Sequence, residues 1–204
     1  MDTSASAGSR IGQATSELQE YLHTSQLRRH IFPRAALVGF CVGVVAIIFR
    51  GLLTGGDAFR NWLIQWAQQS PQWGWIFPVL LGIFGATISV FLVQHYAPEA
   101  SGSGIPHLKA TLHRLRELRW QRVLPVKIVG GTIAIGSGMA LGREGPTVQM
   151  GGAIGDAISR WLKVSAQERL VLIAAGAGAG LAAAFNAPLS GLIFILEEVQ
   201  RDFR

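Results

Sequence analysis

Residues 128–155 read IVGGTIAIGSGMALGREGPTVQMGGAIG, a long apolar stretch rich in glycine. Its only charged side chains belong to Arg143 and Glu144. Two further stretches, residues 71–98 and 170–196, contain no Asp, Glu, Lys or Arg. An uncharged apolar run of about 18 residues or more is long enough to cross the ~30 Å hydrocarbon core of a bilayer. We therefore predict an all-α, polytopic membrane protein.

The composition excludes an ordinary soluble enzyme. Charged residues make up 15% of the 204 residues and hydrophobic residues 50%, whereas a soluble domain carries about 25% charged residues. The 18 Lys and Arg outnumber the 12 Asp and Glu, which gives a net charge of +6. The basic residues lie in short stretches between apolar runs, as the positive-inside bias of membrane proteins predicts. We therefore expect a lipid bilayer as a partner, and no nucleic acid.

The sequence offers no pattern for metal binding or enzymatic catalysis. The single cysteine, Cys41, lies in an apolar run, and the five histidines are scattered along the chain. No Walker-type phosphate loop and no Ser/His/Asp combination stands out. We expect no metal, no cofactor and no enzymatic activity.

The N-terminal region is polar and basic. We expect residues 1–16 to form a disordered tail, followed by one folded unit over residues 17–204. Apolar residues at helical spacing within residues 17–30 predict an amphipathic helix at the membrane interface. Three arginines then precede the first apolar span: Arg28, Arg29 and Arg34. Their position favours a cytoplasmic N-terminus.

Two apolar spans are predicted in the first half, over residues 35–53 and 75–94. Residues 55–69 form a more polar connector with two tryptophans, which prefer the membrane interface. Residues 106–120 predict a short basic amphipathic helix.

Short helices broken by Gly and Pro are predicted for the second half. Glycine accounts for 25 of the 204 residues, well above the usual ~7%. Interrupted helices are tolerated at membrane depth only where protein buries them or where they line an aqueous cavity. Three Gly-xxx-Gly spacings permit close helix contact: residues 39 and 43, 151 and 155, and 176 and 180.

The segment Ser103-Gly104-Ile105-Pro106 predicts a turn that opens a helix, because Pro is favoured in the first helical turn. The free N–H groups of that turn and the positive end of the helix dipole favour an anion. The Ser103 hydroxyl can donate one more hydrogen bond. Ser103, Gly104 and Ile105 are therefore candidate anion-binding residues, and a plain Gly/Ser/Pro turn is the alternative.

The segment 142–146, GREGP, repeats this pattern and adds a carboxylate at a helix start. Burial disfavours the ionised form of Glu144, whereas the helix N-terminus and Arg143 favour it, so Glu144 can change its protonation state. The ionised carboxylate could occupy the anion's own site and leave it when protonated. Arg143 and Gly145 are further candidate anion-binding residues. An Arg–Glu pair that only neutralises itself is the alternative.

A third break at residues 186–188, Asn-Ala-Pro, precedes a last apolar helix that ends in Glu197 and Glu198. Adjacent helical side chains project about 100° apart, so the two carboxylates are expected in different environments. A solvated helix end is the alternative for both.

Three segments together resemble a known family. The sequences GSGIP at 102–106, GREGP at 142–146 and GLAAAFNAPLSG at 180–191 are similar to signature segments of the CLC chloride channels and chloride/proton antiporters. Their order and spacing match as well.

The resemblance implies a role for individual residues. Ser103 corresponds to the serine that coordinates the central chloride, and Glu144 to the gating glutamate that carries protons. Glu198 corresponds to the internal proton glutamate of antiporters, with Glu197 as its neighbour. A bound chloride, transport of chloride and protons, a multi-pass protein of the cell membrane and a homodimeric complete transporter are implied.

The resemblance covers only the first of two inverted repeats, so residues 17–204 correspond to the N-terminal repeat of a CLC transport domain. The second repeat of the family supplies a Gly-x-Phe-x-Pro turn and a coordinating tyrosine. The tyrosines here, Tyr21 and Tyr96, lie in neither context. We expect a chloride/proton antiport half-domain; the alternative is a truncated, non-transporting membrane subunit or assembly partner.

Overall fold

The structure is a computed structural model that describes the backbone of residues 3–69 and 73–200, and the side chains of residues 30–69 and 73–197. These residues form helices and no strand, which confirms the all-α prediction. The α-helices are α1 (Thr3–Ala67), α2 (Ile76–Tyr96), α3 (Ile105–Leu112), α4 (Trp120–Gly136), α5 (Glu144–Trp161), α6 (Ala166–Phe185) and α7 (Pro188–Phe194). A 3-10 helix, η1 (Pro98–Ala100), precedes α3, and a π-helix, η2 (Ile195–Gln200), follows α7.

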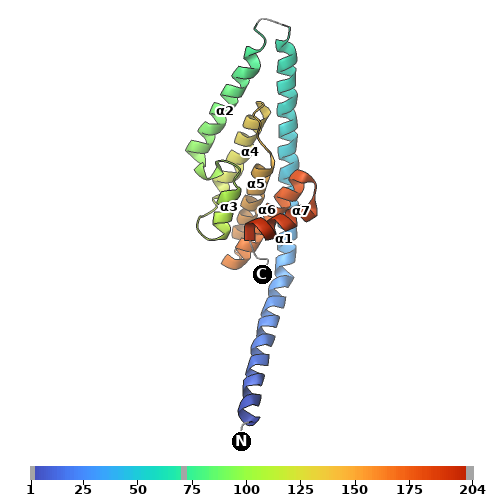
Figure 1. Cartoon of the computed structure of the whole chain (residues 1–204), viewed down its shortest axis with the longest axis vertical. Coiled ribbons are helices and arrows are strands. Elements are labelled where there is room, and N and C mark those ends of the chain that lie inside the picture. The colour runs from blue at the N-terminus through green and yellow to red at the C-terminus, as the bar shows by residue number, and fades with distance from the viewer. Residues whose placement is uncertain (1–2, 70–72, 201–204) are drawn as a thin grey trace.

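Three segments are long and apolar enough to cross a membrane: His30–Ala67 of α1, all of α2 and all of α6. The end of α1 and the start of α2 lie together at the top of Figure 1. The helix α1 continues from the predicted span 35–53 through most of the predicted connector 55–69 and ends at Ala67. Gly56 does not end the helix because it packs closely against Gly136 of α4, where a Cβ on Gly56 would lie 3.0 Å from the Gly136 Cα.

The N-terminal part of α1 extends away from the other helices (Figure 1). Its helix begins at Thr3 and so includes the residues 17–30 that were predicted to be helical. Residues 3–16 belong to this helix, and the disordered tail expected for residues 1–16 stays a prediction. The side chains of that segment lie outside the described residues, and the domain boundary at residue 17 stays a prediction.

The helix α3 is shorter than the predicted helix 106–120 and ends at Leu112. His113 caps it by donating its backbone N–H to the Lys109 carbonyl at 3.0 Å. Arg114 then adopts a left-handed backbone with φ of 59°, which turns the chain out of the helix.

The centre of the structure is the pair α5 and α6, whose contact is the most extensive between any two helices. A Cβ on Gly151 would collide with the Gly176 carbonyl, and a Cβ on Gly155 with the Leu172 carbonyl. The two backbones can approach this closely only because glycine has no side chain. Gly39 and Gly43, by contrast, face open space among the described residues, so their spacing brings no helix close.

Helix α6 begins with a capping box at Ser165. The Ser165 hydroxyl accepts the backbone N–H of Glu168 at 3.3 Å, and the Glu168 carboxylate accepts the backbone N–H of Ser165 at 3.1 Å. The two bonds satisfy N–H groups that a helix start otherwise leaves without partners.

An ion pair of the buried Asp156 ties the end of α5 to the start of α6. Its Oδ2 accepts from Arg160 Nε at 3.0 Å, and its Oδ1 accepts from Arg169 Nε at 2.6 Å. The Asp156 side chain is 0% exposed. A buried carboxylate is tolerated because both of its oxygens have a cationic partner.

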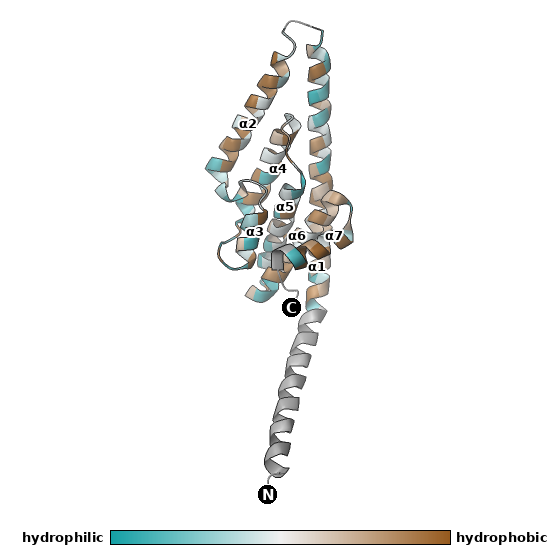
Figure 2. Cartoon of the chain, viewed as in Figure 1, coloured by the Kyte–Doolittle hydropathy of each residue, from teal (hydrophilic) through white to brown (hydrophobic). Residues whose placement is uncertain are grey.

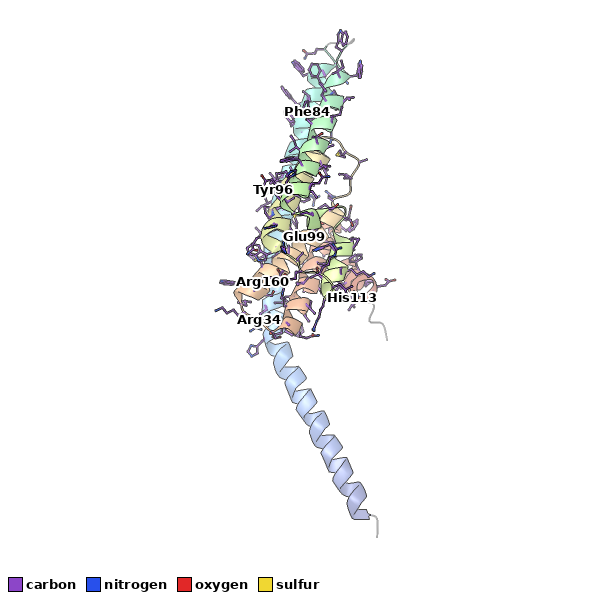
Figure 3. The ribbon with its side chains drawn as sticks, turned by 90° about the vertical axis from the view of Figure 1, so that its left-hand side faces the viewer. Arg34, Phe84, Tyr96, Glu99, His113 and Arg160 are labelled. Carbon is purple, nitrogen blue, oxygen red and sulfur yellow. The ribbon has the colours of Figure 1, made fainter. Side chains whose placement is uncertain are left out.

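Basic residues gather at this end of the structure. Arg34 of α1 bonds to Glu168 at 2.9 Å, and Arg114 bonds to Gln167 at 2.9 Å. Figure 3 places Arg34 and Arg160 at the same end, far from Phe84. The opposite end carries exposed tryptophans near the C-terminal end of α1 and the start of α2: Trp62, Trp66, Trp73 and Trp75.

Helix α2 is largely apolar, as the brown segments of its ribbon in Figure 2 show. Its exposed apolar side chains include Val79, Ile83, Phe84, Ile88 and Phe91. Such a surface suits contact with lipid tails or with further protein.

Candidate functional site

The Ser103 turn opens α3. Its glycines, Gly102 and Gly104, have φ values of 63° and 81°, a left-handed region that a residue with a Cβ seldom adopts. The Ser103 hydroxyl oxygen accepts the Ile105 N–H at 3.4 Å. Its own proton is then available for another acceptor. Pro106 lies in the first turn of α3, as the sequence predicts.

The Glu144 turn opens α5 in a similar way. Arg143 is the N-cap residue, and Glu144 is the first residue of the helix. The Thr147 hydroxyl donates to the carbonyl of Arg143 at 2.9 Å or to that of Glu144 at 2.8 Å, which fixes the first turn. The N–H groups of this turn have no carbonyl partner within the helix.

The two turns meet at Gly145. A Cβ on Gly145 would lie 2.7 Å from the Ser103 carbonyl oxygen and 2.8 Å from the Ser103 Cβ. Real Cβ atoms do not approach other atoms so closely, so only glycine allows this contact. Gly145 therefore brings the starts of α3 and α5 together.

A cavity of about 540 Å³ lies beside this contact. Its wall includes Ser103, Glu144 and Gly145, three of the predicted site residues. Glu144 is half-buried. The remaining wall comes from α2, α4, the segment before Ser103 and the residues around the start of α5, and includes Ser89, Gly102, Lys127, Ile135 and Leu141. Ser103 and Glu144 thus line the same cavity. The binding of an anion there stays a prediction.

The other predicted anion-binding residues lie outside this wall. Gly104 is buried against Gln149, and Ile105 packs against the apolar core. Arg143 is exposed and lines a separate cavity of about 280 Å³, together with Arg50 and Asn186. The third helix start, at α7, is therefore not brought to the cavity of Ser103.

The two predicted carboxylates at the end of the chain lie in η2. The Glu197 side chain is exposed, and that of Glu198 lies outside the described residues. The helix η2 contacts α3, so the backbone of Glu198 belongs to a segment packed on the helix that follows Ser103.

Two buried polar residues beside the site were missed by sequence reasoning. The Lys127 ammonium donates to the carbonyls of Ala100 and Gly102, both at 2.7 Å. The Gln149 side-chain amide donates to the Glu99 carbonyl at 2.8 Å. For Lys127 a signal was present, because it is the lone cation at the edge of the stretch 128–155. Gln149 gives no such signal.

Among the side chains that the structure describes, no group of three or more His, Cys, Asp and Glu comes close enough to hold a metal ion.

Known proteins resemble the chain in sequence. The family model for voltage gated chloride channels matches residues 85–204. The H(+)/Cl(-) exchange transporter ClcA of Citrobacter koseri is 46% identical over 172 residues, which cover 83% of this chain and 36% of that protein. ClcA of Vibrio cholerae is 55% identical over 131 residues, which cover 64% of this chain and 28% of that protein. The chain thus spans about a third of the length of the curated relatives it matches.

Solved structures give the same relationship. A slow cyanobacterial Cl−/H+ antiporter matches with a TM-score of 0.81 and 40% identity, over 85% of this chain and 41% of that one. A eukaryotic CLC transporter matches with a TM-score of 0.71 and 27% identity, over 83% of this chain and 33% of that one. These relatives are transporters rather than enzymes. Since the family model also covers more than half of the chain, the chain belongs to the voltage gated chloride channel family, the CLC transporters.

Proposed function

We propose that this chain contributes one half of a chloride/proton antiport pathway across a membrane. The observation that carries the proposal is the cavity shared by Ser103 and Glu144, which lie at the starts of two different helices. The exchange transporters named above add weight, because they are similar to this chain over most of its length.

The chemistry of the cavity wall suits chloride. The first turns of α3 and α5 offer backbone N–H groups and the positive ends of two helix dipoles. The Ser103 hydroxyl accepts the Ile105 N–H and keeps its proton for an anion. An anion in this position replaces its hydration shell with donors that are already in place.

Glu144 couples chloride to protons in this proposal. The ionised carboxylate competes with chloride for the same N–H donors, and protonation removes its affinity for them. One chloride can then enter as one proton is carried away. Glu198 passes protons to the other side of the membrane, because it corresponds to the internal proton glutamate of the family.

The proposed topology places the N-terminus in the cytoplasm and the transporter in the plasma membrane of the cell. The cluster of Arg34, Arg114, Arg160 and Arg169 at one end supports this orientation, because cytoplasmic ends of membrane proteins are rich in arginine. Exposed tryptophans at the other end suit the second interface. We expect the complete transporter to be a homodimer.

The test is a flux assay on liposomes that contain the purified protein. We expect outward chloride flow to drive protons inward, and Glu144→Gln to abolish the proton movement while chloride still flows. Glu197→Gln is the matched control, because that carboxylate is exposed and away from the cavity. Proton pumping by the Glu144→Gln protein would contradict the gating role.

A non-transporting membrane subunit is the second candidate function. The exposed apolar face of α2 favours it, because such a face also suits assembly with another membrane protein. Anion-selective efflux from liposomes that hold this chain alone would reject this candidate. Chloride binding without any flux would support it.

A further inference from the structure

The backbone before Ser103 is held by two buried side chains from two different helices. We propose that Lys127 and Gln149 are positioning residues that hold the carbonyl oxygens of Glu99, Ala100 and Gly102 away from the anion, so that the donors of the Ser103 turn face it. This inference rests on the proposed function, since it concerns the same cavity.

Lys127 holds two of these carbonyls. Its ammonium group, on the middle of α4, donates to Ala100 O and Gly102 O at 2.7 Å each. The residue is only 6% exposed, and it belongs to the wall of the cavity. Both bonds go to neutral carbonyl groups rather than to a carboxylate. The ammonium group therefore has no carboxylate partner among these bonds, and it lies beside the place proposed for chloride, where a positive charge attracts an anion.

Gln149 holds a third carbonyl from a different helix. Its side chain, on α5, is 0% exposed and donates to Glu99 O at 2.8 Å. The Gln149 side chain also packs against Gly104 of the turn. A Cβ on Gly104 would collide with the Gln149 amide group and lie 2.7 Å from the Gln149 Cβ. One buried side chain thus contacts both η1 and the turn that opens α3.

The neighbouring carbonyls are satisfied as well. Ala100 N–H donates to the Ala97 carbonyl at 2.9 Å, and Ser101 N–H donates to the Pro98 carbonyl at 3.2 Å. With the three carbonyls held by side chains, the oxygens of Ala97, Pro98, Glu99, Ala100 and Gly102 all have donors.

The hydrogen bonds to these carbonyl oxygens decide which ion the turn can bind. A backbone turn offers acceptors as well as donors, and a free carbonyl oxygen repels an anion and attracts a cation or water. Occupied carbonyls cannot turn toward the cavity without breaking a buried bond, which carries a large penalty. Lys127 and Gln149 therefore favour anions over cations by acting on the backbone.

The test compares chloride binding by the purified protein, measured by calorimetry, with its thermal stability. Gln149→Leu removes one donor at nearly constant size and without a change of charge. We expect it to weaken chloride binding about tenfold, the usual effect of one lost hydrogen bond. Lys127→Met removes two bonds and the charge and should weaken binding by more than about tenfold. Lys127→Arg keeps the charge and the donors and should restore most of the affinity.

The matched control is Thr111→Val. Thr111 is 4% exposed and donates a similar side-chain bond to the His107 carbonyl at 3.0 Å, but it is not part of the cavity wall. It should lower the melting temperature about as much as Gln149→Leu while chloride affinity stays unchanged. In liposomes, cation leak should rise with Gln149→Leu and not with Thr111→Val.

Unchanged chloride affinity and unchanged selectivity in the Gln149→Leu protein would overturn the inference. If that variant does not fold, Gln149→Asn replaces it, because the shorter side chain withdraws the amide from Glu99. Unchanged affinity and selectivity in that protein would likewise overturn the inference. Loss of affinity in Thr111→Val as well would also overturn it, since the effect would then be one of stability. Failure of the unchanged protein to bind chloride would instead refute the proposed function.

Discussion

Replacement of Asp156 by Asn should destabilise the protein by about 3 kcal/mol, the lower end of the range for breaking a buried ion pair. The side chain is 0% exposed and its oxygens lie 3.0 Å from Arg160 Nε and 2.6 Å from Arg169 Nε. Asn keeps the size of Asp, but one of its oxygens becomes an NH2 group that faces an arginine donor. The lower end applies because the arginines are 46% and 31% exposed and can turn toward water.

The assay is thermal unfolding of the protein in detergent, followed by tryptophan fluorescence. A loss of about 3 kcal/mol corresponds to a fall of about 6–12 °C in melting temperature for a chain of this size. Arg34→Gln is the matched control, because its partner Glu168 is 13% exposed whereas Asp156 is 0% exposed, so this pair should contribute less than about 1 kcal/mol. The reasoning about Asp156 fails if both variants melt at the same temperature.

Four further substitutions test the packing and one helix cap. Gly151→Ala should destabilise the α5–α6 contact by about 1–3 kcal/mol through overpacking. Gly39→Ala lies in open space and should stabilise α1 by about 0.5–1 kcal/mol. Chemical unfolding of both variants measures whether each free energy of unfolding falls or rises. Ser165→Ala removes a capping box and should cost about 1 kcal/mol, measured as faster amide exchange in the first turn of α6. Gly145→Ala should push the Ser103 turn from α5 and weaken chloride binding about tenfold in calorimetry, since overpacking costs about 1–3 kcal/mol.

The helical class and the two helix starts could be predicted from the sequence because each has a local cause. Uncharged runs longer than the bilayer core predict spans, and Gly and Pro mark the turns before α3 and α5. The end of α1 could not be predicted in this way. Gly55 and Gly56 reduce helix propensity locally, but the contact of Gly56 with Gly136 comes from a distant helix and depends on the tertiary fold.

Two buried charged residues could not be predicted from the sequence, Lys127 beside the site and Asp156 in the ion pair, and both share a physical reason. A search for uncharged stretches ends at a charged residue and treats that residue as the edge of the membrane. Lys127 and Asp156 are such edges of the stretch 128–155, yet both are buried. Their partners are two carbonyl oxygens in one case and two arginines in the other, and neither set can be recognised from the sequence alone.

The arrangement of α5 separates its stability from its site. The first turn carries Glu144, Gly151 contacts α6 near the middle, and Asp156 lies in the last third, about 18 Å from Glu144 at 1.5 Å per residue. Because the glycine contacts hold the backbone between these points, loss of the ion pair should loosen the far end and leave the first turn in place. We therefore expect Asp156→Asn to lower the melting temperature while chloride affinity stays within about twofold, as is usual for sites this far apart. An affinity loss as large as that of Gly145→Ala would show that α5 does not act as a rigid support, and that its two ends are coupled.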